Sequence, residues 1–101
     1  MDLNLRDKVI LVTGGSKGIG HAISHVLADE GAIPFIVSRN EESILSTVKE
    51  IEEKGGKCSY AIAELTDPDQ GKTAVEKAIA EFGTLHGLVN NAGVNDGVGL
   101  E

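Results

Sequence analysis

The chain has 101 residues, which fits one domain and is too short for a two-domain enzyme. Hydrophobic residues make up 41% and charged residues 25%, a composition typical of folded globular proteins and not of disordered or disulfide-stabilised ones. The formal net charge of −7 repels nucleic acid and anionic lipid overall, so any phosphate must be bound by a local feature.

Neither a membrane span nor a secretion signal is expected. The longest apolar stretches, residues 9–12 and 33–37, are far shorter than the about 20 residues of a membrane helix. The first residues lack a basic segment followed by an apolar core. The single cysteine, Cys58, cannot form an internal disulfide, which suits a reducing compartment. We therefore expect a cytoplasmic protein with no nucleic-acid or membrane partner.

The first half of the chain predicts two strands and two helices. Residues 8–13 are a short, β-branched apolar run typical of a buried strand, and residues 33–38 form a second such run. Helical periodicity follows each run and ends at glycines, Gly31 and then the pair at 55–56. The apolar faces expected on the two helices comprise Ile19, Ala22, Ile23, Val26 and Leu27, and then Ile44, Leu45, Val48 and Ile51.

The second half continues the alternation. Residues 57–63 predict a weaker third strand and residues 85–90 a fourth. Between them, Asp67 and Pro68 offer an N-cap and a proline at the first helical position, Gln70 can complete a capping box, and Gly83 ends the helix. The expected core face of this helix comprises Val75, Ala78, Ile79 and Phe82. The alternation predicts an α/β fold with a doubly wound parallel sheet of the Rossmann type, in strand order 3-2-1-4.

A glycine-rich loop at residues 13–20 connects the first strand to the first helix. Its pattern is T-G-x-x-x-G-x-G, which differs from the general G-x-G-x-x-G fingerprint. Gly14 permits a tight turn, Gly18 lets the backbone approach a ligand, and Gly20 allows close packing of helix and strand. A helix N-terminus binds anions, so the loop predicts a pyrophosphate site. A glycine-rich turn without a ligand is the alternative.

The loop at residues 13–20, taken with the sequence Asn-Asn-Ala-Gly at 90–93, resembles the short-chain dehydrogenase/reductase family. The resemblance covers essentially the whole chain but only the first half of the family's domain. It implies that the dinucleotide pyrophosphate is held by Gly14, Ser16, Lys17, Gly18, Ile19 and Gly20. It also implies that the central sheet is braced, and the adenosine ribose lined, by Asn90, Ala92 and Gly93. Asn90 and Asn91 can equally be read as a polar strand end.

The resemblance also assigns the residues around the adenosine. Glu64 and Leu65 occupy the place where the family usually has Asp and an apolar residue against the adenine, although Glu64 can also be a solvated carboxylate. After the second strand, Ser38 and Arg39 stand where an NAD enzyme typically has an acid. Arg39 can form a fork to a 2′-phosphate, and Lys17 adds a second cation. NADP(H) is therefore favoured and NAD(H) stays open, since Glu41 and Glu42 are near enough to pair with Arg39.

The family's catalytic Tyr-x-x-x-Lys pair and upstream Ser cannot be placed. Tyr60 is the only tyrosine, and Glu64 stands where the lysine would be. We expect residues 1–101 to be the dinucleotide-binding half of an oxidoreductase that interconverts a small alcohol and a carbonyl, with the catalytic half beyond residue 101. Family members are commonly dimers or tetramers, which implies a homo-oligomer. The alternative is a stand-alone NAD(P)-binding module. Residues 1–5 and 91–99 resemble the L-fucose dehydrogenase branch, which implies a sugar or polyol substrate.

Two histidines have the spacing of metal ligands. His21 and His25 lie at positions i and i+4 of a predicted helix, but Ala22 replaces the glutamate of a His-Glu-x-x-His site and no third ligand is apparent. No metal is expected on this basis. His86 is interpreted as structural and Cys58 as a small buried hydrophobic residue.

Overall fold

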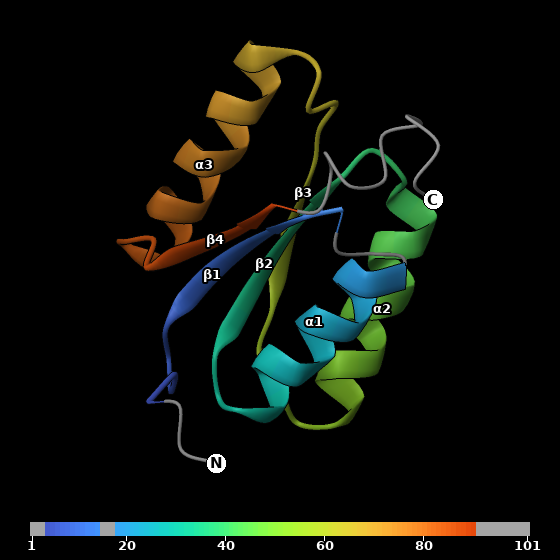
Figure 1. Cartoon of the computed structure of the whole chain (residues 1–101), viewed down its shortest axis with the longest axis vertical. Coiled ribbons are helices and arrows are strands. Elements are labelled where there is room, and N and C mark those ends of the chain that lie inside the picture. Colours follow the sequence, from blue (N-terminus) through green and yellow to red (C-terminus); the bar gives the residue numbers. More distant parts are fainter. Residues whose placement is uncertain (1–3, 15–17, 91–101) are drawn as a thin grey trace.

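The computed structural model describes residues 4–14 and 18–90. Within them, strands and helices alternate as β1 (Val9–Thr13), α1 (Gly18–Asp29), β2 (Ile33–Ser38), α2 (Glu41–Glu53), β3 (Ser59–Ile62), α3 (Pro68–Phe82) and β4 (Gly87–Asn90). Every paired strand is parallel to its neighbour, and the sheet has the order β3-β2-β1-β4 (Figure 1). The predicted doubly wound fold and its strand order are confirmed.

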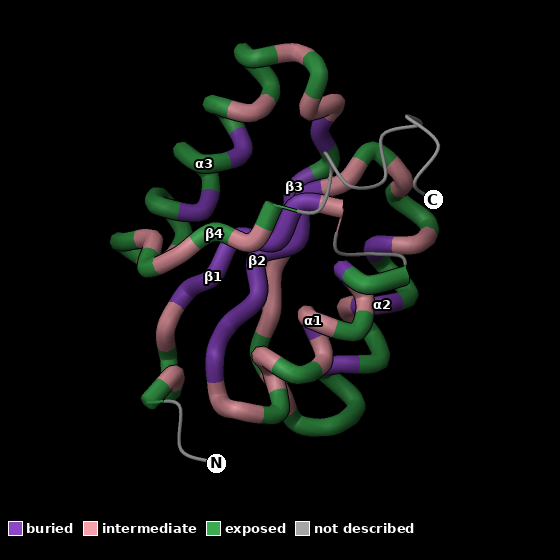
Figure 2. The backbone as a smooth tube through the Cα atoms, viewed as in Figure 1, coloured by how far each residue is buried: buried purple, intermediate pink, exposed green. Residues whose placement is uncertain are grey.

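Helices cover both faces of the sheet, with α1 and α2 on one side and α3 on the other (Figure 1). Side chains alternate between the faces. Val9 and Leu11 of β1 join the cluster that contains Ala78 of α3, whereas Val12 joins the cluster against which Leu27 of α1 packs. Because β1 and β2 lie in the middle and are covered on both sides, they are the most buried strands (Figure 2).

The expected core face of α1 is wrong in part. Ile19, Ala22 and Val26 are exposed, and the buried positions are Gly20 and Ser24. These small residues let the helix approach its neighbours closely, and the Ser24 hydroxyl donates to the Gly20 carbonyl at 2.9 Å, so its burial leaves the hydroxyl hydrogen-bonded. The inward face of α1 is therefore marked by small side chains and not by the largest apolar ones.

The other two helices show the same departure. Leu45 of α2 is 44% exposed, whereas Thr47, which the apolar pattern passed over, is 1% exposed. In α3, Ile79 is 44% exposed and Val75 is also exposed, and Ala78 is buried against the sheet. In both helices the buried strip is therefore shifted from the predicted apolar face toward smaller side chains.

Element ends follow the local turn signals, with small differences. β3 and β4 are shorter than the predicted 57–63 and 85–90. Asp67 caps α3 by accepting from the Asp69 N–H at 3.0 Å, and Gly83 ends the helix at a φ of 82°. The Gln70 side chain does not complete the predicted capping box but accepts from the Glu64 N–H at 2.7 Å. In the described part of the chain, the helices are too short and too polar to cross a membrane.

Candidate functional site

The four strands end at one edge of the sheet, which we term the carboxyl edge. In the strand register, Thr13 lies opposite both Val37 and Asn90, and Ser38 lies opposite Ile62. The candidate residues that the structure describes at or just beyond these strand ends are Gly14, Gly18, Ser38, Arg39, Glu64, Leu65 and Asn90. Open α/β sheets bind ligands at this edge, so the fold itself brings the predicted site residues together.

The described glycines on either side of residues 15–17, Gly14 and Gly18, both have positive φ. Gly14 has a φ of 67° and donates its N–H to the Val37 carbonyl at 2.8 Å, which joins the loop to the end of β2. Gly18 begins the helix at a φ of 54°, and a Cβ added there meets no described atom within 4 Å. Gly20 is buried, and Ile19 is 57% exposed. Among the described residues, nothing therefore blocks the approach of an anion to this helix N-terminus.

Two predicted residues, Arg39 and Glu64, form an ion pair that connects the segments after β2 and β3. Arg39 Nη1 donates to Glu64 Oε2 at 3.0 Å, and the two side chains are 79% and 37% exposed. The hydrogen bond from Arg39 and a second from the Thr66 backbone lower the pKa of Glu64. The sequence suggested Glu41 or Glu42 as partners for Arg39, but among the described residues its ion pair is with Glu64.

Two hydrogen bonds hold the turn between β2 and α2, in which Arg39 lies. The half-buried Ser38 accepts from the Asn40 N–H through its Oγ at 3.3 Å, and Asn40 caps α2 by accepting from the Ser43 N–H at 2.9 Å. Beside this turn lies an open cavity of about 440 Å³, lined by His21, Asn40, Glu42, Ser43, Ser46 and Thr47. The cavity lies between α1 and α2, next to the residues that follow β2.

Asn90 and Leu65 occupy the remaining described positions of the carboxyl edge. The Thr13 hydroxyl donates to Asn90 Oδ1 at 2.9 Å, so β4 is joined to β1 at their ends. Leu65 is half-buried and packs against the core cluster of β1, β2 and α3. The other predicted residues, Ser16, Lys17, Ala92 and Gly93, lie outside the described residues.

Tyr60, His86 and Cys58 have structural surroundings. The Tyr60 ring packs against the cluster of Ile36, and Lys77 lies 5.3 Å from its centroid. His86 Nδ1 accepts from the Val9 N–H at 2.9 Å. Burial, followed by the charge of Glu52, raises the pKa of Cys58 to about 11, so the thiol is protonated and unreactive near neutrality.

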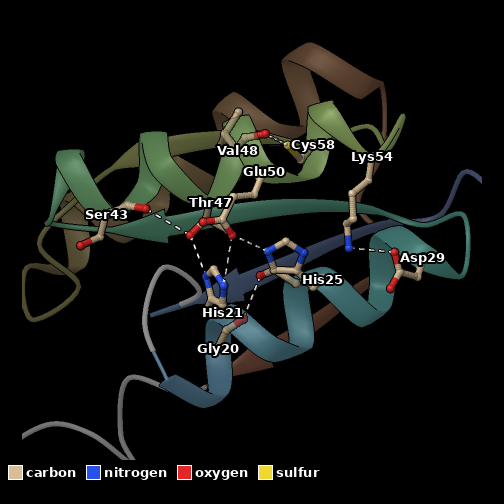
Figure 3. A network of polar contacts seen from close by, with 11 residues as sticks. Gly20, His21, His25, Asp29, Ser43, Thr47, Val48, Glu50, Lys54 and Cys58 are labelled. Carbon is tan, nitrogen blue, oxygen red and sulfur yellow. Dashed lines mark hydrogen bonds and ion pairs between the residues drawn. The ribbon is translucent and has the colours of Figure 1, made fainter.

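One cluster was missed by the sequence analysis. Glu50 of α2 contacts both His21 and His25 of α1, and Thr47 contacts His21 (Figure 3). Helical spacing related the two histidines to each other, but nothing local relates either of them to Glu50. Only the packing of α2 against α1 brings the third side chain to them.

Comparison with known proteins finds a matching family model and similar reductases and dehydrogenases. The family model described as short chain dehydrogenase matches residues 8–101. A 3-oxoacyl-[acyl-carrier-protein] reductase of Chlamydia muridarum is 39% identical over 95 residues, which are 93% of this chain and 38% of that protein.

Two solved structures are also similar. The L-sorbose reductase of Gluconobacter frateurii, complexed with NADPH and L-sorbose, has a TM-score of 0.86 and 33% identity, covering 91% of this chain and 35% of that one. A citronellol catabolism dehydrogenase of Pseudomonas aeruginosa has a TM-score of 0.82 and 41% identity, covering 85% and 36%. The chain thus spans little more than a third of the length of these relatives.

Proposed function

Because the chain belongs to the short-chain dehydrogenase family, we propose that residues 1–101 are the dinucleotide-binding half of an oxidoreductase that interconverts an alcohol and a carbonyl. The observation that carries this proposal is the N-terminus of α1 at Gly18, which no described residue blocks and which lies on the same edge of the sheet as Arg39. One feature suits a pyrophosphate and the other a further phosphate.

Most of the candidate residues are proposed to bind the dinucleotide directly. The backbone at Gly14, Gly18, Ile19 and Gly20 would hold the pyrophosphate, completed by Ser16 and Lys17. Asn90, with Ala92 and Gly93, would brace the sheet and line the ribose, and Leu65 would pack on the adenine. When bound, the nicotinamide supplies the position that gives or takes a hydride. The chain's own residues bind and orient the dinucleotide.

We favour NADP(H) over NAD(H) because of the charge after β2. Position 38 is a serine and not an acidic residue, and Arg39 is exposed enough to reach a 2′-phosphate. Its present partner is Glu64, and an ion pair this exposed contributes little because solvent screens it. A charge-assisted hydrogen bond to a phosphate contributes about 1.5–3 kcal/mol. We therefore expect Arg39 to give up its ion pair with Glu64 in favour of a hydrogen bond to the 2′-phosphate. The similar L-sorbose reductase was solved with NADPH, which supports the preference.

The substrate and assembly follow from the relatives. We propose a small alcohol or carbonyl substrate, with a sugar or polyol as the narrower choice, because the similar L-sorbose reductase was solved with L-sorbose. The resemblance to the L-fucose dehydrogenase branch rests on residues 1–5 and 91–99, most of which lie outside the described residues. We also propose that the whole protein is a cytoplasmic homo-oligomer. Turnover of a panel of sugars, polyols and simple alcohols by the whole protein tests the substrate class.

Dissociation constants of NADPH and NADH, measured by calorimetry, test the binding proposal. We expect the unaltered chain to bind NADPH about 10- to 150-fold more tightly than NADH. Arg39→Ala should remove most of this preference, whereas Glu64→Gln should strengthen NADPH binding by up to about fivefold because it releases the guanidinium. Arg6→Ala is the control, because Arg6 is the other arginine of the sequence and precedes β1. Tighter binding of NADH, or an unchanged preference in Arg39→Ala, would overturn the assignment.

A further inference from the structure

A cluster of three potential metal ligands lies between α1 and α2, among residues not assigned to the dinucleotide. His21 and His25 come from one face of α1, one turn apart, and Glu50 comes from α2. One ligand atom from each side chain lies within 4.8 Å of those of the other two. We propose that His21, His25 and Glu50 bind a divalent transition-metal ion, with Zn²⁺ as the ion that suits the set best.

The distances are close to those of a tetrahedral site. Glu50 Oε1 lies 3.0 Å from His25 Nε2 and 3.4 Å from His21 Nε2. Ligand atoms bonded to zinc at about 2.0–2.1 Å in a tetrahedron are separated by ~3.3 Å. Both imidazoles point toward the same carboxylate (Figure 3). Two nitrogen-to-oxygen edges of the tetrahedron are therefore nearly formed, and small side-chain movements would complete the site.

The hydrogen bonds of Thr47 orient His21 for metal binding. Thr47 Oγ1 donates its only proton to the Ser43 carbonyl at 3.1 Å, so it accepts from His21 Nδ1 at 2.9 Å. Thr47 thus engages His21 Nδ1, and the other ring nitrogen, Nε2, faces Glu50 Oε1 at 3.4 Å. A metal ion bound there would take Nε2 and the carboxylate oxygen as ligands while Nδ1 stays bonded to Thr47. Metal-binding histidines commonly donate their second nitrogen in this way.

The cluster is accessible to an ion from solvent. The side chains of His21, His25 and Glu50 are 36%, 19% and 49% exposed. The cavity of about 440 Å³ is lined by His21 and Thr47, so a further coordination position can be taken by water. The nearby ammonium of Lys54 is bound to Asp29 at 2.9 Å. The net charge of −7 also favours cations.

The donor set selects the class of metal. Two imidazoles and one carboxylate suit zinc and other transition metals, whereas Ca²⁺ and Mg²⁺ prefer ligand sets made entirely of oxygen. An ion bound here would join α1 to α2 directly. It would therefore stabilise the face of the sheet that these two helices cover, and the melting temperature reports this effect independently of any catalytic activity.

Zinc chloride titrated into the chelator-treated chain and followed by calorimetry is the test. We expect saturable binding of one ion, weakened at least about tenfold by Glu50→Gln and by His25→Gln. Glu53→Gln makes the same charge change one turn along α2, and His86→Gln removes the remaining histidine, so these controls should bind as the unaltered chain does. Zinc should also raise the melting temperature of the controls but not of Glu50→Gln.

Further variants separate the site from other zinc ligands. Thr47→Val keeps all three ligands but removes the acceptor for His21, and we expect zinc binding to weaken about tenfold. Cys58→Ala should leave it unchanged. Circular dichroism checks that every variant is folded. A ligand variant is compared with its control only when both are folded. The absence of saturable binding, equal affinity in Glu50→Gln and Glu53→Gln, or loss of binding in Cys58→Ala would overturn the proposal.

Discussion

The interior of the sheet and its carboxyl edge are built from different interactions. β1 is buried along its whole length, and Phe35 and Ile36 of β2 have no exposed surface. At the carboxyl edge, Arg39 and Glu64 form an exposed ion pair, and a Cβ added at Gly18 would meet no described atom within 4 Å. Burial of apolar area dominates stability, whereas exposed ion pairs contribute little to it. Loss of these exposed contacts should therefore weaken the fold much less than loss of the buried ones.

The two ends of β3 show the same contrast in their titratable groups. Cys58 precedes the strand and is half-buried, and burial raises the pKa of its thiol to about 11. Glu64 follows the strand and is paired with Arg39, which lowers the pKa of its carboxyl group. The first environment disfavours charge and the second stabilises it, although only a few residues separate the two groups.

The largest effect is expected for Phe35→Ala in the interior. Phe35 has no exposed surface and contacts Phe82 edge to face, with ring centroids 6.4 Å apart. The cavity and the lost burial should lower the free energy of unfolding by about 3–5 kcal/mol, measured by urea denaturation. Val26→Ala, at a 56% exposed position that periodicity assigned to the core, should change it by less than about 0.5 kcal/mol. Equal losses in the two variants would contradict this account of the core.

Gly18→Val separates binding from stability at the carboxyl edge. Gly55→Val is its matched control, because both glycines have positive φ, 54° and 85°, and both face open space among the described atoms. The backbone strain should cost each variant about 1–3 kcal/mol of unfolding free energy. Only Gly18→Val should also lose dinucleotide affinity, by at least tenfold, because its side chain fills the approach to the helix N-terminus. Equal NADPH affinity in the two variants would refute the role of the loop.

The smallest effect is expected from the thiol of Cys58. Its pKa is raised from 9.0 to about 11, so at pH 8 the folded chain has about 100-fold less thiolate than the unfolded chain. Alkylation by iodoacetamide should be slower in the native chain than in urea by a similar factor. The folded state also holds this proton more tightly, so the free energy of unfolding should fall as the pH rises from about 9 to 11.

Cys58→Ala is the control for this pH dependence. The variant lacks the titrating group, so its free energy of unfolding should fall less over the same range of pH. Equal alkylation rates in the native and the urea-unfolded chain would show that the thiol is not shielded by burial.

Local signals predicted most of the fold. Short apolar runs predicted β1 and β2, and the cap at Asp67 and the glycine at Gly83 predicted the ends of α3. Helix faces were predicted less well, because a search for large apolar residues overlooks small buried ones such as Ser24. A small side chain is informative only when the surface packed against it is known.

By itself, the sequence determined the alternation of strands and helices, the glycine turn before α1 and the position of Arg39 after β2, since each depends on neighbouring residues. The tertiary structure alone decided which side chains meet across the elements. Glu64 pairs with Arg39, and Glu50 with His25, in each case across 25 residues of sequence. These contacts depend on the register of the strands and on how closely the helices approach, and no local pattern encodes either distance.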